Sequence, residues 1–200
     1  MKYIFVAGAP GSKWSSVARN IYHSSNIDRS DAQADRSYSR DGTVMHVGSY
    51  FDPGMEFGTW FDQLDKHTRE ECETEFDRPF SGTGVRIIKS HVFMYHIGFL
   101  KKNWPDAPII MVHRGDDACL GWWVRSGGFN ISYPDYTKYY KDLDFMAAEI
   151  TRQNSAMRPY WDLGSFVYNN YELCDYLGIK YPSVEYQQTY ADHKVRVKVY

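Results

Sequence analysis

A short apolar run followed at once by a glycine-containing turn opens the chain and constrains its fold more than any other segment. Residues Tyr3 to Ala7 are apolar throughout and predict a buried strand. Gly8, Pro10 and Gly11 predict a tight turn, and residues 17–22 begin a helical pattern. This order of elements directs backbone N–H groups and the positive end of a helix dipole at one point. An anion, most often a phosphate, is expected there.

The turn carries side chains that suit a phosphate, but it is not a Walker A motif, which requires G-x-x-x-x-G-K-[ST]. With Lys13 aligned, Ala7 and Ser12 stand in place of the two glycines, and Trp14 replaces the metal-binding hydroxyl. The alternative is a plain strand-to-helix turn with a serine N-cap. The loop residues expected to contact the bound cofactor are Pro10, Gly11, Ser12, Lys13, Trp14, Ser15 and Ser16.

Composition indicates a single soluble globular domain over residues 1–200, long enough to bury a core. The net charge of −2 provides no general attraction to nucleic acid or to a membrane surface. Three isolated cysteines without a C-x-x-C pair favour a reducing compartment. No apolar run approaches the ~20 residues of a membrane-spanning helix. We therefore expect a cytoplasmic protein without a signal peptide or a membrane span.

Strand and helix patterns alternate along the rest of the chain. Further strands are expected at 85–89, at 108–113 and, as an edge strand, at 195–200. Helices are expected at 57–72, 93–104, 116–126, 139–157 and 168–177. This alternation predicts an α/β fold in three layers, with a mainly parallel central sheet flanked by helices and a P-loop-like architecture.

A lysine and a histidine follow the strand expected at 85–89. Lys89 and His91 are separated by one residue, so in an extended chain their side chains lie on one side. A cation and a base can then face one reacting group. The alternative is a solvent-exposed lysine beside a capping histidine.

An arginine follows the strand expected at 108–113. Arg114 could hold a phosphate with a charge-assisted, bidentate contact, or it could instead pair with Asp116 or Asp117. In open α/β sheets, ligands bind at the carboxyl ends of the strands. The opening loop, the lysine–histidine pair and this arginine are therefore expected to lie close together.

Taken in order, these segments resemble the sulfotransferase family that uses 3′-phosphoadenosine 5′-phosphosulfate (PAPS). Residues 10–15 resemble the family's Pro-Lys/Arg-Ser-Gly-Thr-Thr/Ser loop around the 5′-phosphosulfate, with the basic residue moved from the second to the fourth position. Lys89-Ser90-His91 resembles its Lys-Thr/Ser-His signature. Residues 109–117 resemble the strand and loop that hold the 3′-phosphate, and residues 171–179 resemble the closing helix with its Phe/Tyr-Leu-Gly ending.

The resemblance implies sulfuryl transfer from PAPS to an acceptor hydroxyl, with adenosine 3′,5′-bisphosphate (PAP) as product and no metal. His91 would be the general base. Lys13 and Lys89 would neutralise the departing phosphate oxygen, and Arg114 would hold the 3′-phosphate. Trp14 would stack on the adenine or, alternatively, belong to the core.

The chain departs from the family's pattern in two places. Trp122 stands where the family often has a serine, and Ser126 is the nearest hydroxyl that could bind the donor instead. The family's C-terminal Arg-Lys-Gly loop is absent. The basic residues available to replace it are Lys194, Arg196 and Lys198.

Two other functions stay open. A P-loop nucleotide or small-molecule kinase would need Mg²⁺ and a hydroxyl directly after Lys13. A non-catalytic nucleotide-binding protein would have no use for a base at His91. The expected acceptor is a small-molecule, glycan or peptide hydroxyl, with pocket walls at 24–59 and 129–140. No nucleic-acid partner is expected, and an oligomer is compatible with the sequence.

Overall fold

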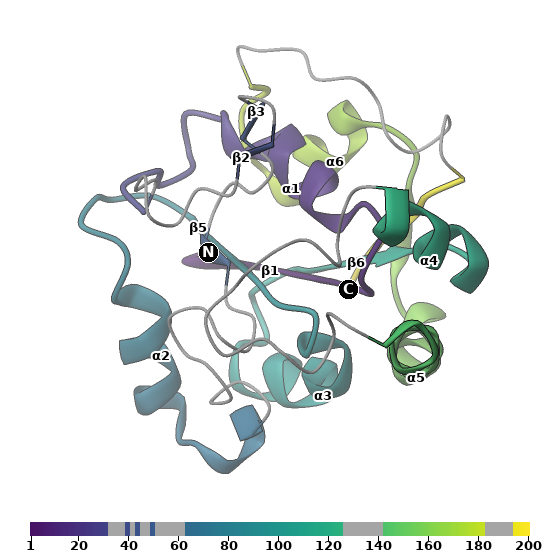
Figure 1. Ribbon diagram of the computed structural model, residues 1–200. Helices are drawn as coiled ribbons and strands as arrows, with labels where there is room; N and C mark the ends of the chain where they lie inside the picture. Colours follow the sequence, from purple (N-terminus) through teal and green to yellow (C-terminus); the bar gives the residue numbers. More distant parts are fainter. Residues whose placement is uncertain (32–38, 41–42, 45–48, 51–62, 126–141, 183–193) are drawn as a thin grey trace.

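A central sheet organises the computed structural model, which describes residues 1–31, 39–40, 43–44, 49–50, 63–125, 142–182 and 194–200 (Figure 1). The strands follow one another across the sheet in the order β4-β5-β1-β6-β8-β7. Their bounds are β1 Tyr3–Gly8, β4 Ser49–Tyr50, β5 Arg86–Lys89, β6 Ile109–His113, β7 Ser165–Val167 and β8 Arg196–Val199. Strands β2 (Ser39–Arg40) and β3 (Thr43–Val44) form a separate antiparallel pair.

Helices cover both faces of the sheet, as an α/β fold requires. Their bounds are α1 Trp14–Tyr22, α2 Arg69–Asp77, α3 Phe93–Asn103, α4 Asp116–Arg125, α5 Leu143–Trp161 and α6 Asn170–Leu177. Figure 1 shows α1 and α6 on one face and α2, α3 and α5 on the other. None of the helices in the described ranges has both the length and the apolar content needed to cross a lipid bilayer.

Strand β1 is buried on both faces, which explains its continuous apolar run. Ile4 and Val6 pack into one core with α1 and α6, whereas Tyr3 and Phe5 pack into a second core with α2 and α3. All four side chains are essentially inaccessible to solvent. The expected three layers and the α/β class are confirmed in this part of the chain.

The sheet is mixed, so the expectation of a mainly parallel sheet holds for only part of it. Strands β4, β5, β1 and β6 run parallel, but β8 runs antiparallel to β6 and to β7. The prediction of an edge strand at 195–200 was wrong, because β8 lies between β6 and β7. Val197 and Val199 join the core on the α1 face, and the Lys198 side chain is buried on the other face.

Helix α2 and strand β7 also differ from expectation. In the described part of the helix expected at 57–72, α2 begins only at Arg69, because Thr68 and Glu71 form a capping box that fixes its start. Residues 57–62 lie outside the described ranges. Strand β7 was not predicted, since three residues carry too little periodicity to be recognised.

The strand order places the site. Strands β5, β1 and β6 are neighbours and parallel, with Val6 opposite Lys89 and Gly8 opposite Val112. Their carboxyl ends therefore meet at one edge of the sheet. The opening loop, the lysine–histidine pair and the arginine all follow these ends.

Candidate anion-binding site

The loop after β1 is a tight turn that only glycine can complete. The Ser12 amide donates to the Ala9 carbonyl over 3.0 Å, with Pro10 and Gly11 between them and a Gly11 φ of 77°. Pro followed by a residue with positive φ is the pattern of a type II turn. A Cβ added to Gly11 would lie 2.0 Å from the backbone carbonyl oxygen of Cys119. The loop thus lies directly against α4.

Two backbone N–H groups of this loop, those of Gly11 and Lys13, lack a hydrogen-bond acceptor in the described part of the chain. Gly11 and Lys13 both have positive φ, and Ser12 between them does not, so successive amides form a concave arrangement that suits an anion. Within the described ranges, the Gly11 and Lys13 amides donate no hydrogen bond. Helix α1 has no acidic residue in its first turn and no side chain capping its start. The serine N-cap is therefore not observed, and the end of the helix dipole is left for a ligand.

The Lys13 ammonium lies over the ring of Trp122 in α4, with Nζ 3.4 Å from the ring centroid. The guanidinium carbons of Arg114 and Arg125 lie 6.0 Å and 5.9 Å from the same centroid. Burial, together with the charges of these two arginines, lowers the pKa of Lys13 to about 8. Three cations from different parts of the chain thus gather around one indole.

Arg114 turns toward the loop and not toward the neighbouring acidic residues. Its Nη1 donates to the Gly11 carbonyl over 3.3 Å, and its Nε has no hydrogen-bond partner in the described part of the chain. The Asp116 carboxylate instead accepts from Asn154 and from Thr151. The side chain of Arg114 is buried, and this burial lowers its pKa. A buried guanidinium beside the loop is thus left without a carboxylate partner among the described residues.

His91 is fixed by the first strand. Its Nδ1 lies 2.7 Å from the Gly8 carbonyl oxygen. Because a carbonyl can only accept, Nδ1 carries the proton, and Nε2 is the basic atom of the neutral ring. The ring lies 4.4 Å from that of Trp14 and is only 3% exposed.

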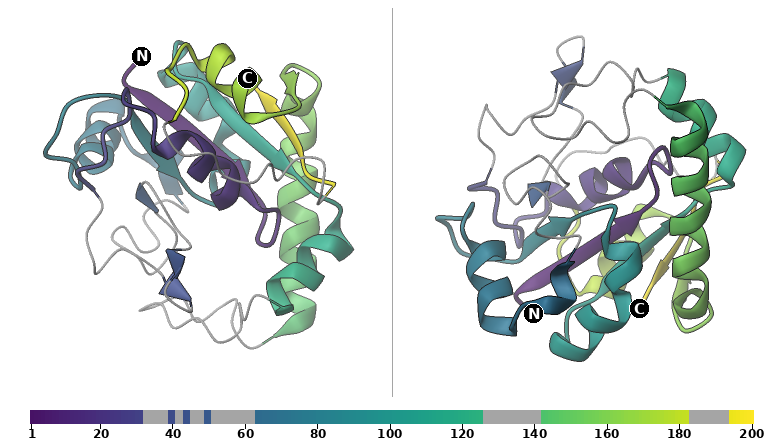
Figure 2. Two further views of the ribbon diagram at one scale, coloured as in Figure 1. Left: turned by 90° about the horizontal axis from the view of Figure 1, so that it is seen from above. Right: turned by 60° about the horizontal axis from the view of Figure 1, so that its bottom comes forward.

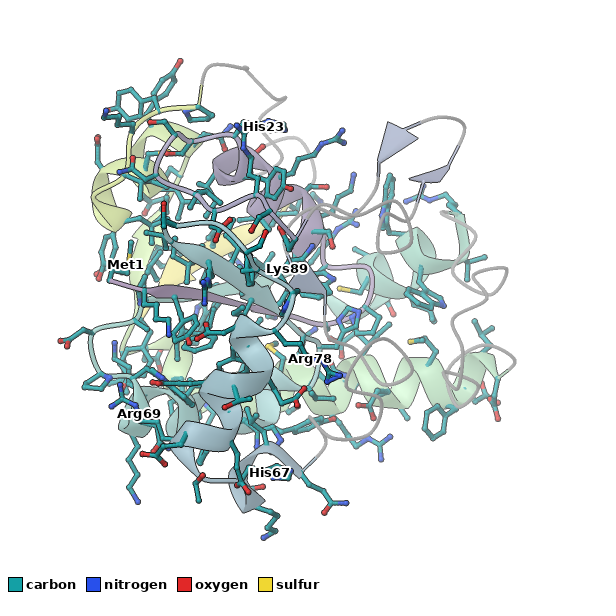
Figure 3. The ribbon with its side chains drawn as sticks, turned by 90° about the vertical axis from the view of Figure 1, so that its left-hand side faces the viewer. Met1, His23, His67, Arg69, Arg78 and Lys89 are labelled. Atoms are coloured by element: carbon teal, nitrogen blue, oxygen red, sulfur yellow. The ribbon has the colours of Figure 1, made fainter. Side chains whose placement is uncertain are left out.

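Lys89 lies deeper than expected. It is fully buried, with Nζ 5.6 Å from the ring centroid of Trp14, and Figure 3 shows it among the interior side chains. Desolvation lowers its pKa to about 7, and the nearby charge of Asp31 opposes that shift. Trp14 is itself 4% exposed, which favours its place in the core over stacking on an adenine. The Ser12 hydroxyl beside it is buried and has no hydrogen-bond partner within the described ranges.

The remaining candidates lie elsewhere. Ser126 is outside the described residues. Arg196 and Lys198 lie on the α5 face of β8, where Arg196 donates to His113 Nδ1 over 3.0 Å and Lys198 donates to the Trp161 carbonyl over 2.8 Å. Both side chains are thus engaged on that face of the sheet.

The sequence did not predict that Trp122 contacts the loop lysine. Its spacing from Arg125, three residues along a helix, was the only signal that these side chains share a face. The contact with Lys13 depends on how α4 packs against the loop. Comparisons of the chain with protein-family models, curated proteins and solved structures found no match.

Proposed function

We propose that this protein is a sulfotransferase that moves a sulfuryl group from PAPS to an acceptor hydroxyl. One observation carries the proposal: two cations, Lys13 and Arg114, and one base, His91, surround a single loop with unpaired N–H groups. Cations without carboxylate partners beside such a loop suit a ligand with more than one phosphate group. A positioned base suits a reaction in which a hydroxyl must lose its proton.

In this proposal each part of the donor has its own contacts. The Gly11 and Lys13 amides and the start of α1 hold the 5′-phosphate, in a P-loop-like manner. Arg114 holds the 3′-phosphate, which distinguishes PAPS from ADP and ATP. The Lys13 ammonium leaves the Trp122 ring and meets the bridging oxygen, where negative charge develops.

The proposed chemistry is an in-line displacement at sulfur. The acceptor oxygen forms a bond to sulfur, and the bond between sulfur and the 5′-phosphate oxygen breaks. The acceptor proton passes to Nε2 of His91, and PAP leaves with the electron pair of the broken bond. Because Lys89 is fully buried, we propose that it acts through its charge beneath the loop.

The acceptor hydroxyl belongs to a small molecule, a glycan or a peptide in this proposal. We also propose that the protein works in a reducing, cytoplasmic compartment. The buried cysteines Cys72, Cys119 and Cys174 are all free thiols and support that location.

The proposal is tested by following a radiolabelled sulfuryl group from PAPS to a panel of phenols and glycans. We expect transfer by the wild-type protein and a loss of ~10²–10⁴-fold in His91→Ala, with PAP binding retained. His67→Ala, in a histidine that precedes α2, is the matched control and keeps full activity. Transfer retained in His91→Ala would remove this residue from the mechanism.

A second measurement separates the alternatives. A ligand that binds the native state raises the melting temperature according to its affinity. The proposal predicts a larger shift with PAP than with ATP and Mg²⁺. The reverse order would favour a kinase, and a shift with PAP without transfer to any acceptor would favour a non-catalytic nucleotide-binding protein.

A further inference from the structure

A second concave site lies across the sheet from α1. A cavity of about 460 Å³ opens between the carboxyl end of β6, the start of β8 and the last turns of α5. Figure 2 shows the long green helix α5 beside the yellow strand β8. Arg196, His113, Arg158 and Trp161 are among its lining residues. None of them has a part in the proposed sulfuryl transfer.

The hydrogen bond between Arg196 and His113 determines which ring nitrogen of His113 can donate into this cavity. Arg196 Nη2 donates to His113 Nδ1 over 3.0 Å, so the ring proton of His113 is on Nε2. Burial and the charge of Arg196 lower the pKa of His113, although the charge of Asp116 opposes this shift. Because the pKa is lowered, the ring is neutral near pH 7. The Arg196 guanidinium lies 6.0 Å from the Trp161 ring centroid.

The two arginines of the cavity are available to a ligand. Within the described ranges, neither Arg196 nor Arg158 forms an ion pair with a carboxylate. Two carboxylates also line the cavity: Asp116 already accepts two hydrogen bonds, and Asp162 is exposed to solvent.

The carboxyl end of α5, which is the negative end of its dipole, lies at the cavity and would oppose an anion. The buried Lys198 ammonium offsets it by donating to the Trp161 carbonyl over 2.8 Å. The lining itself holds two arginines and two carboxylates. The carboxylates disfavour a polyanion, whereas two arginines without ion-pair partners in the described ranges suit a single anionic group.

We infer that this cavity binds a tetrahedral oxyanion group, phosphate or sulfate, on a small ligand whose ring packs against Trp161. Guanidinium groups hold such oxyanions with paired hydrogen bonds, and Arg196 and Arg158 approach from different elements. The Nε2–H of His113 supplies a further donor. The inference does not depend on the proposed sulfotransferase activity, because the two sites share no residue.

Titration calorimetry with four probes tests the inference: inorganic phosphate, inorganic sulfate, phenyl phosphate and phenyl sulfate, each added to protein saturated with PAP. We expect Arg196→Ala and Arg158→Ala each to weaken binding by about tenfold or more, the scale of hydrogen bonds to charged groups. Asp162→Asn should tighten it a few-fold. Arg78→Ala, on the distant α2 side in Figure 3, is the matched control and changes nothing.

The variants also separate this site from the loop. PAP affinity should be unchanged in Arg196→Ala, and Arg114→Ala should leave phenyl phosphate affinity in the cavity intact even if PAP does not bind to the wild-type protein. Tighter binding of the phenyl esters than of the inorganic ions would support the part assigned to Trp161. If each probe binds Arg196→Ala and Arg158→Ala as tightly as it binds the Arg78→Ala control, the inference is overturned.

Discussion

At the amino-terminal ends of β1 and β5 the charged side chains pair with one another, whereas Lys13 and Arg114, which follow the carboxyl ends of β1 and β6, meet no carboxylate in the described part of the chain. At the amino-terminal edge, Asp77 accepts from Lys2 and Tyr3 over 2.7 Å each and also pairs with Arg86. Burial opposes ionisation of Asp77, but these hydrogen bonds prevail and hold its pKa below the usual range.

The difference separates charge used for stability from charge kept for a ligand. A paired carboxylate at one edge ties α2 to the sheet. At the other edge, desolvation and like charges lower the pKa of Lys13 and of Arg114, which is a cost to the folded protein in the absence of an anion. Such perturbed cations are characteristic of functional sites.

Among the charged residues of these two regions, removal of Lys13 should have the largest effect. In Lys13→Ala we expect the sulfuryl-transfer rate to fall on the order of 10²-fold, because the charge that Lys13 meets develops in the transition state. PAP affinity should fall much less. Single-turnover rates and calorimetry on the same preparation measure both quantities, with Lys66→Ala as control. An equal loss of rate and affinity would reduce Lys13 to a docking residue.

Asp77→Ala should behave in the opposite way. It leaves Lys2, Tyr3 and Arg86 without their shared acceptor, so we expect the free energy of unfolding to fall by about 1–3 kcal/mol, with PAP affinity unchanged. Arg114→Ala should instead leave stability unchanged or slightly higher, since it removes a cation beside Lys13. Urea denaturation of both variants provides the comparison. A loss of stability in Arg114→Ala equal to that in Asp77→Ala would erase the distinction between the two edges.

Lys89 should make stability depend on pH. Its pKa is about 7 in the folded state and is higher in the unfolded chain, so between these values the unfolded chain binds more protons and stability rises with pH. The contribution of one such group is at most about 1.4 kcal/mol per pH unit. In Lys89→Met this contribution is absent. The free energy of unfolding of the variant should exceed that of wild type by an amount that shrinks from about pH 7 to about pH 10. Parallel stability curves for the two proteins would contradict the burial of a titrating lysine.

A smaller effect is expected on PAP binding. The pKa of Lys13 is about 8 in the free protein, so the ammonium that attracts the anion loses its proton as pH rises through that value. PAP affinity should therefore fall a few-fold between about pH 7 and about pH 9, and the fall should be absent in Lys13→Met. Calorimetry across this range measures it, and a flat wild-type profile would argue against contact between Lys13 and the ligand.

Local patterns predicted much of this fold. The apolar runs at β1, β5 and β6 located the parallel strands, and the rule that ligands bind at carboxyl ends predicted that the loop, His91 and Arg114 would meet. Strand β8 was assigned to the edge because Arg196 and Lys198 alternate with valines, as on a solvent-facing strand. In the structure Lys198 is instead covered by Trp161 and Phe166, which are distant in sequence.

The details of the site depended on packing that no local pattern contains. Lys89 and His91 were expected to face one group together, but both lie against Trp14, and Lys89 is inaccessible to solvent. Lys13 reaches the Trp122 ring only because α4 packs against Gly11, where the Cys119 carbonyl leaves no room for a side chain.

The most direct test of the difference between the two edges is calorimetry of PAP and ADP, without metal, on wild type and Arg114→Ala. We predict that wild type binds PAP more tightly than ADP. Arg114→Ala should weaken PAP by about 1.5–3 kcal/mol, the scale of hydrogen bonds to a charged group, and leave ADP nearly unchanged. Equal affinity of wild type for the two nucleotides, or an equal loss for both in Arg114→Ala, would contradict a 3′-phosphate site at this edge of the sheet.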